Sequence, residues 1–217
     1  QFPEELLSLF GGGDMSTPEG FYQVEMFGLM IPISIMVVTI VIGTAALAGE
    51  EKRNTMGLLL ANPVRRSTIV VQKTWTMILY AVIVGLAAFL GVAAGSLLGG
   101  LGMDMGNIAA ACALAVLLGV AFGALALALG AATGLTQIAS YGSVGVAVVA
   151  FIINGFLPLN DSTAAWAKVS PFYYYLSSDP LLTGMHWGHA AILGGLFVIL
   201  VAAAIVLFQR RDLRQTG

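Results

Sequence analysis

Residues 105–160 contain no Asp, Glu, Lys or Arg, and this long uncharged segment is the strongest constraint on the fold. A helix needs about 20 mostly apolar residues to cross the hydrocarbon core of a bilayer. The segment is therefore long enough for two crossings, with a turn expected at residues 133–137. Together with three other uncharged segments it predicts five spans, at approximately 26–48, 74–98, 106–132, 137–158 and 187–208.

The overall composition supports a membrane protein and excludes a soluble domain. Hydrophobic residues make up 59% of the chain and charged residues only 9%, which is more apolar surface than a soluble domain can hide. Gly and Ala are spread evenly. Apolar and polar residues do not alternate with the period of two that is typical of strands in a membrane β-barrel. We expect residues 1–217 to form a single all-α transmembrane domain, a polytopic helical bundle.

The basic residues indicate how this bundle is oriented. All nine Lys and Arg residues except Lys168 lie in the loop at 49–73 or in the C-terminal tail at 209–217. Because positive charge is retained on the cytoplasmic side, both segments are expected inside. Most acidic residues then fall outside, namely Glu4, Glu5, Asp14, Glu19, Glu25, Asp104, Asp161 and Asp179.

Parity places residues 1–25 and the loop at 159–186 outside. A chain that begins outside with Gln, without a basic n-region or a signal-peptide core, is expected to continue upstream. We expect one more span there, which would make six.

The inside loop contains a short amphipathic segment. Asn54 or Thr55 can cap a helix whose apolar residues are Met56, Leu58, Leu59 and Leu60, and Pro63 would end it before Arg65 and Arg66. Such a helix could rest on anionic headgroups. Alternatively, it could be a docking surface for a soluble partner, and the residues alone leave both interpretations open.

Two other patterns have structural interpretations. Glycines recur every fourth residue at 91, 95 and 99, at 119 and 123, and at 130 and 134, a spacing that serves helix packing or lines a subunit interface. The aromatic residues Tyr173–Tyr175 and Trp166 are expected to form an interfacial belt rather than to contact substrate.

Several motifs together resemble the type-2 permeases of ATP-binding-cassette (ABC) exporters. The first cytoplasmic loop of that family is similar to the pattern of Glu50, Glu51, Thr55, Leu59 to Pro63, Arg65 or Arg66, and Lys73. Its last external loop is similar to residues 170–184, and its C-terminal Arg-Arg-Asp to residues 210–212. The segment from Pro3 to Gly12 is similar to the part that follows the first span of that family, so the resemblance covers nearly the whole chain.

The resemblance implies a membrane permease subunit of a prokaryotic plasma-membrane exporter that works with a separate ATPase and with a second permease, identical or sister. The coupling residues would be Glu50, Glu51, Thr55, Met56, Leu58, Leu59, Leu60, Pro63, Arg65 and Arg66. ATP and Mg²⁺ would be bound by the ATPase, because this chain has no Gly-Lys-Ser/Thr phosphate loop. We expect no catalytic residue, metal or cofactor in the chain itself.

Two other functions stay open from the sequence. The chain could be a structural or regulatory membrane subunit without transport activity. It could also be an intramembrane metalloprotease, because Glu50 and Glu51 resemble the paired glutamates of that class of enzyme. Such a site needs converging ligands at membrane depth, whereas His186 and His189 are expected on the far side of the membrane.

Overall fold

The computed structural model describes residues 17–56, 65–160 and 162–211, and within these ranges all regular structure is helical. Five helical segments are long and apolar enough to cross a membrane: Pro18–Lys52, Arg66–Gly99, Met105–Thr133, Thr136–Leu159 and Trp187–Arg210. The predicted all-α class with five long apolar helices is therefore confirmed. The side of the membrane on which each loop lies stays a prediction.

The first long segment is one continuous helical path with two wider π-helical stretches. It consists of α2 (Pro18–Tyr22), η1 (Gln23–Met30), α3 (Ile31–Thr44), η2 (Ala45–Gly49) and α4 (Glu50–Lys52). Thr17 caps its start by accepting a bond from the Gly20 amide at 3.1 Å. Pro32 has no amide hydrogen and its ring crowds the carbonyl of Gly28, which accounts for the departure from α-helical bonding just upstream.

Helix α7 (Met105–Thr133) lies at the centre of the bundle. It contacts α3, α6 (Arg66–Gly99), α8 (Thr136–Phe156) and α11 (Trp187–Arg210). Asp104 caps its start, because Oδ1 accepts a bond from the Asn107 amide at 2.9 Å. At its other end the turn to α8 falls within the expected residues, and Gly134 adopts a left-handed conformation with φ of 69°.

Helices α3 and α7 approach each other closely, and glycines make that approach possible. A Cβ atom on Gly123 would lie 2.5 Å from Met77 Sδ and 2.7 Å from Thr39 Cβ. A Cβ atom on Gly119 would meet Ile35 in the same way. The Thr39 hydroxyl donates to the Gly119 carbonyl at 2.7 Å across this contact. This glycine pair therefore serves helix packing, one of the two functions considered for the glycine rows.

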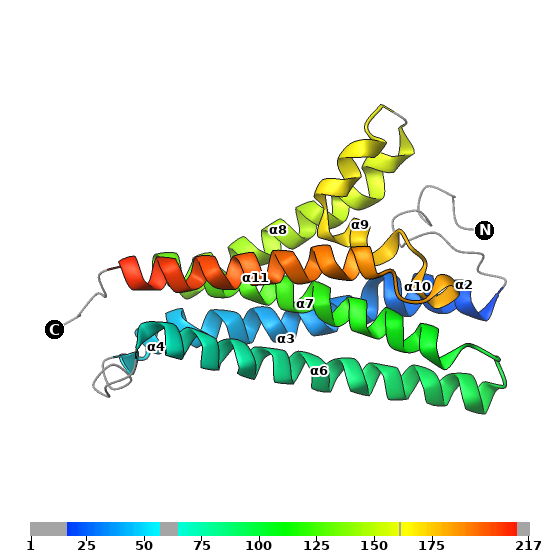
Figure 1. Cartoon of the computed structure of the whole chain (residues 1–217), viewed down its shortest axis with the longest axis horizontal. Coiled ribbons are helices and arrows are strands. Elements are labelled where there is room, and N and C mark those ends of the chain that lie inside the picture. Colours follow the sequence, from blue (N-terminus) through cyan, green and yellow to red (C-terminus); the bar gives the residue numbers. More distant parts are fainter. Residues whose placement is uncertain (1–16, 57–64, 161, 212–217) are drawn as a thin grey trace.

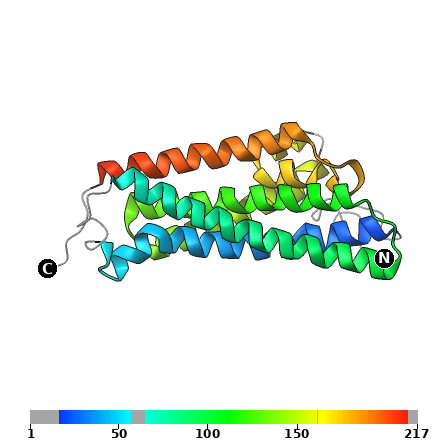
Figure 2. The same cartoon turned by 60° about the horizontal axis from the view of Figure 1, so that its bottom comes forward.

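The outer helices expose broad apolar faces. In Figure 1 helix α8 leans away from the other long helices, whereas α11 and α6 lie along α7. Figure 2 shows α11 along one edge of the bundle after the molecule is turned. Large apolar side chains such as Trp75, Leu90, Tyr141 and Val198 are exposed on these helices. Lipid is the solvent that suits such faces.

Between α8 and α11 the chain forms four short helices: η3 (Leu157–Leu159), η4 (Ala164–Val169), α9 (Pro171–Leu176) and α10 (Pro180–Thr183). Ser170 attaches α9 to α8, because its hydroxyl donates to the Ala150 carbonyl at 2.7 Å. Tyr175 is fully buried, and its hydroxyl donates to the Phe27 carbonyl in η1 at 2.7 Å. The expectation that Tyr175 belongs to an interfacial belt is therefore wrong, since it is a core residue.

Candidate functional site

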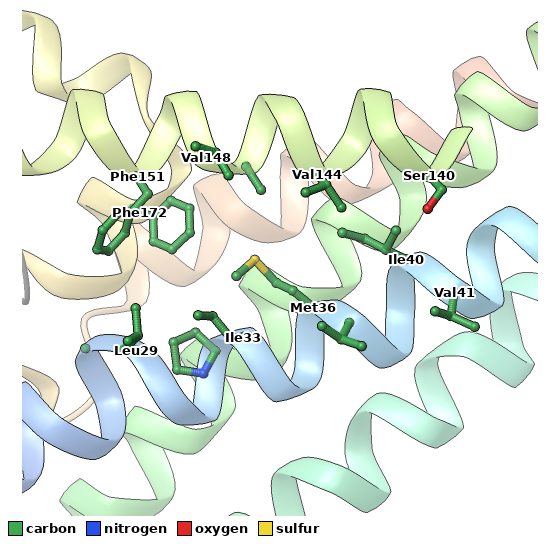
Figure 3. A pocket seen from close by; sticks show the side chains of 14 residues that line it. Leu29, Ile33, Met36, Ile40, Val41, Ser140, Val144, Val148, Phe151 and Phe172 are labelled. Carbon is green, nitrogen blue, oxygen red and sulfur yellow. The ribbon is translucent and has the colours of Figure 1, made fainter. Parts of the chain in front are cut away.

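An apolar cavity of about 320 Å³ lies between α3 and α8, and it is open to the surface of the protein, since several of its lining side chains are exposed. Figure 3 shows side chains from the two helices facing each other across it, with Phe172 of α9 at one end. Ser140 is the only lining residue with a polar side chain. The lining residues are Gly28, Leu29, Pro32, Ile33, Met36, Val37, Ile40, Val41, Ser140, Val144, Ala147, Val148, Phe151 and Phe172.

Aromatic rings close the α9 end of this cavity. The Phe151 and Phe172 rings pack edge to face with centroids 5.4 Å apart, and Phe122 lies 5.8 Å from Phe172. Helix α9 holds Phe172 in place through the Ser170 cap, which accepts a bond from the Phe172 amide at 3.2 Å. The cavity can therefore receive an apolar group, and it offers one hydroxyl group at its opposite end.

The residues predicted to couple the chain to a partner lie in α4, in the loop that follows it and at the start of α6. Glu50, Glu51, Thr55, Met56, Arg65 and Arg66 fall within the described ranges, whereas Leu58, Leu59, Leu60 and Pro63 fall outside them. The interpretation of the loop centre as a short amphipathic helix therefore stays a prediction.

Glu50 forms the first of two ion pairs that the described residues make at this end of the bundle. Its Oε1 lies 2.6 Å from Lys73 Nζ of α6, and its Oε2 accepts a bond from the Thr55 hydroxyl. The Thr55 amide and hydroxyl also donate to the Glu50 carbonyl, at 3.0 and 3.1 Å. These bonds turn the chain sharply after α4, where Asn54 adopts a left-handed conformation with φ of 57°.

Glu51 forms the second ion pair, with Arg211 at the end of α11. The Arg211 Nη1 atom also donates to the carbonyls of Gly130 and Ala131, each at 3.1 Å. These carbonyls belong to the last turn of α7, where a cation is favoured, and the Gly130 carbonyl also accepts a bond from the Gly134 amide at 2.9 Å. One guanidinium group thus joins α4 to the end of α7.

Arg66 ties the start of α6 to the end of α11. Its Nη1 donates to the carbonyls of Phe208 and Arg211, at 3.2 and 2.9 Å. The guanidinium also lies 5.8 Å from the centre of the Phe208 ring, within cation–π range. Met56, only 5% exposed, packs in the same region within an apolar cluster that includes Phe208.

The sequence did not single out two of these participants. Arg211 was expected only as part of a basic tail and of the C-terminal Arg-Arg-Asp pattern, and Lys73 only as part of the loop pattern of the family. A usable signal was present, because Glu50 and Glu51 are acids placed among the basic residues of their own side. The cavity had no comparable signal, since its apolar lining resembles any lipid-facing helix.

The described residues give the metalloprotease alternative no support. Among them no three His, Cys, Asp or Glu side chains converge to hold a metal ion. His186 and His189 stack on each other at 4.1 Å at the start of α11. Glu51 pairs near the end of that helix, and 24 helical residues span about 36 Å.

Comparison with known proteins gives one match. The family model described as ABC-2 family transporter protein matches residues 5–213. No curated protein matches the chain significantly, and no solved structure does.

Proposed function

The chain belongs to the ABC-2 family of transporter proteins, and from this premise we propose that it is the permease subunit of an ABC exporter in a prokaryotic plasma membrane. It is a multi-pass membrane protein, and its family implies an ATPase partner. On this proposal it moves cargo by conformational change and performs no covalent chemistry.

The apolar cavity between α3 and α8 is the observation that carries the proposal. It lies between two candidate membrane spans, and thirteen of its fourteen lining residues have no polar side chain group. A site of this kind suits an apolar or amphipathic cargo, such as a lipid or a hydrophobic drug. An ion path usually carries ionisable groups at membrane depth, and none lines this cavity.

Energy would reach the cavity through the loop after α4. Helix α3, which lines the cavity, continues through η2 into α4 and so into the ion pairs of Glu50 and Glu51. A partner ATPase that pushed on the loop would therefore act on the same continuous helix that lines the cavity. The sequence contains no Gly-Lys-Ser/Thr phosphate loop, so ATP and Mg²⁺ would be bound by that partner.

A second permease, identical or sister, would complete the transporter. Helix α8 bears exposed apolar residues beyond those that line the cavity, including Val146, Val149 and Ile152. A surface of this kind is compatible with lipid or with another permease. Mass measurement of the purified complex tests the stoichiometry, because two permeases and two ATPases are expected in one particle.

Transport in proteoliposomes tests the proposal. The permease is co-purified with its ATPase, and ATP-dependent movement of rhodamine 6G and of a fluorescent phosphatidylcholine is followed. Val144→Trp should occupy the space that cargo needs and reduce transport about tenfold, which corresponds to about 1.4 kcal/mol of lost cargo binding. Val146→Trp is the matched control, because Val146 lies on the same helix outside the cavity lining.

Two results would contradict the proposal. Equal transport by the Val144→Trp and Val146→Trp variants would show that the cavity is not on the cargo path. Failure of the wild-type chain to retain an ATPase or to move either probe would contradict the exporter function itself.

A further inference from the structure

We infer that Arg211 is a positioning residue that ties both ends of the coupling loop, residues 53–65, to the ends of α7 and α11. The inference rests on the proposed function, because a coupling role presupposes an ATPase that acts on the loop. It concerns a residue outside the loop and outside the coupling pattern that the sequence suggested.

Arg211 holds the beginning of the loop through its side chain. Its guanidinium pairs with Glu51, which lies two residues before the loop starts. The side chains of Arg211 and Glu51 are only 17% and 13% exposed. The pair is therefore shielded from water and salt much better than a surface ion pair, which contributes little.

Arg211 holds the end of the loop through its backbone. Arg66, the first residue after the loop, donates to the Arg211 carbonyl at 2.9 Å. The two ends of the loop therefore meet at one residue, which also closes the last turn of α11. A displacement of either end would pull on Arg211.

The same guanidinium connects this junction to the central helix of the bundle. It donates to the Gly130 and Ala131 carbonyls, which close the last turn of α7. Gly134 leaves room for the arrangement, because a Cβ atom there would lie 2.5 Å from Glu51 Oε2 and 2.8 Å from Arg211 Nη1. Arginine suits this position, since its planar fork presents several donors at fixed angles.

Arg211 therefore connects the loop to α7 and α11, two spans that do not adjoin the loop in the sequence. Without the Arg211 side chain, the loop would keep its covalent connections to α4 and α6 and the packing of Met56 in its apolar cluster. Helix α7 would lose its bonds to the guanidinium that pairs with Glu51, while its packing against α3 through Gly119 and Gly123 would be unaffected. Arg211 is therefore expected to matter for transmission of movement more than for folding.

Three variants separate the effect of the Arg211 charge from the effects of its guanidinium geometry and of its position in the chain. Arg211→Gln removes the charge and the fork. Arg211→Lys keeps the charge but cannot present donors to Glu51 and to two carbonyls together. Arg210→Gln is the matched control, because it removes the same charge from an exposed neighbouring residue.

The first measurement uses the permease alone in lipid nanodiscs. Hydrogen exchange is followed for the backbone amides of residues 50–56, at the beginning of the loop, and of residues 127–134. Arg211→Gln should accelerate exchange in both segments about tenfold, because the guanidinium bonds to Glu51 and to the Gly130 and Ala131 carbonyls would be lost. Arg211→Lys should give an intermediate effect, and Arg210→Gln should leave exchange as in the wild type.

The second measurement uses the complex with the ATPase, with and without ATP and vanadate. In the wild type and in Arg210→Gln, trapping the nucleotide should change exchange in both segments. In Arg211→Gln the loop segment should still respond, whereas the response of residues 127–134 should be lost. A purely structural role of Arg211 would not separate the two responses.

The outcomes distinguish this inference from the proposed function. If α7 responds equally in Arg211→Gln and Arg210→Gln, or if exchange in the permease alone is unchanged, the role given to Arg211 is wrong. If the wild-type chain retains no ATPase, the proposed function fails, and with it the coupling role. The exchange measurement in the permease alone then still decides whether Arg211 joins the loop to α7.

Discussion

At the scale of single residues, Tyr175 fastens the short helices between α8 and α11 to the first long helix. Its hydroxyl donates to the Phe27 carbonyl, which lies in the π-helical stretch η1 upstream of Pro32. Wider π-helical turns are frequent at functional sites. Here the π-helical stretch η1 contains the Phe27 carbonyl, which accepts the bond from Tyr175 of α9.

Replacing Tyr175 with Phe should destabilise the protein by about 1–2 kcal/mol, because the Phe27 carbonyl would keep its burial and lose its side-chain donor. Thermal unfolding in detergent measures the effect. Tyr173→Phe is the control, since Tyr173 is only partly buried and its ring packs edge to face on Tyr174. Equal unfolding temperatures for the two variants would contradict the importance of the Tyr175 bond.

Asp179 is a second residue to consider, because its buried environment makes the stability of the protein depend on pH. Burial raises the pKa of its carboxyl group, and Oδ1 is buried without a hydrogen-bond partner among the described residues. For an acid whose folded-state pKa is raised, ionisation opposes folding. Stability is therefore greatest below the unfolded pKa, near 3.9. It falls as pH rises through the interval between the unfolded and folded pKa values.

Asp179→Asn should accordingly raise the unfolding temperature at pH 7, by about 2 °C. The difference from the wild type should disappear near pH 3.5, where both side chains are neutral. Asn also tolerates the left-handed backbone at this position, where φ is 42°. Asp104→Asn is the control, because Asn caps a helix about as well as Asp. A gain that persists at low pH would rule out the ionisation argument.

At the scale of the elements, the contact between α3 and α7 depends on having no side chain at Gly123. Gly123→Ala should force α3 away from α7 and weaken the Thr39–Gly119 bond, at a cost of about 1–3 kcal/mol. Gly91→Ala is the matched control, because a Cβ atom there meets nothing within 4 Å. It should be neutral or slightly stabilising through helix propensity. If both variants unfold at the same temperature, the close approach is not required.

The contrast between these two glycines shows how far the sequence could predict the structure. The spacing at Gly91, Gly95 and Gly99 is the same as that at Gly119 and Gly123, yet only the second row lies between α3 and α7. Spacing identifies a face on which helices can approach closely, and it does not identify the neighbour. The neighbour depends on the packing of the whole bundle.

The helices themselves were easier to predict than the site. Long uncharged segments specify spans directly, and Gly134 marks the turn between α7 and α8 because only a residue that tolerates positive φ fits there. The Glu51–Arg211 pair joins residues 160 positions apart. Charge segregation placed both on one side, and no local pattern could indicate that they touch.

At the scale of the whole molecule, the bundle has two chemically different ends. One end gathers Glu50, Glu51, Lys73, Arg66 and Arg211 into bonds between the ends of α4, α6, α7 and α11. The other carries the short helices that lead into α11, with Lys168 as the one basic residue of that segment. In Figure 1 the first of these ends lies at the left of the long axis, and the short helices α9 and α10 lie in the right half.

This polarity predicts the orientation of the protein, because basic residues are retained on the cytoplasmic side. A single cysteine is introduced at Arg53 or at Ala165, both exposed, in a Cys112→Ala background. In intact cells an impermeant maleimide should label the cysteine at Ala165 and spare the one at Arg53, which should react only after permeabilisation. Labelling in the reverse pattern would place the coupling loop outside, out of reach of any cytoplasmic ATPase, and would overturn both the orientation and the proposed function.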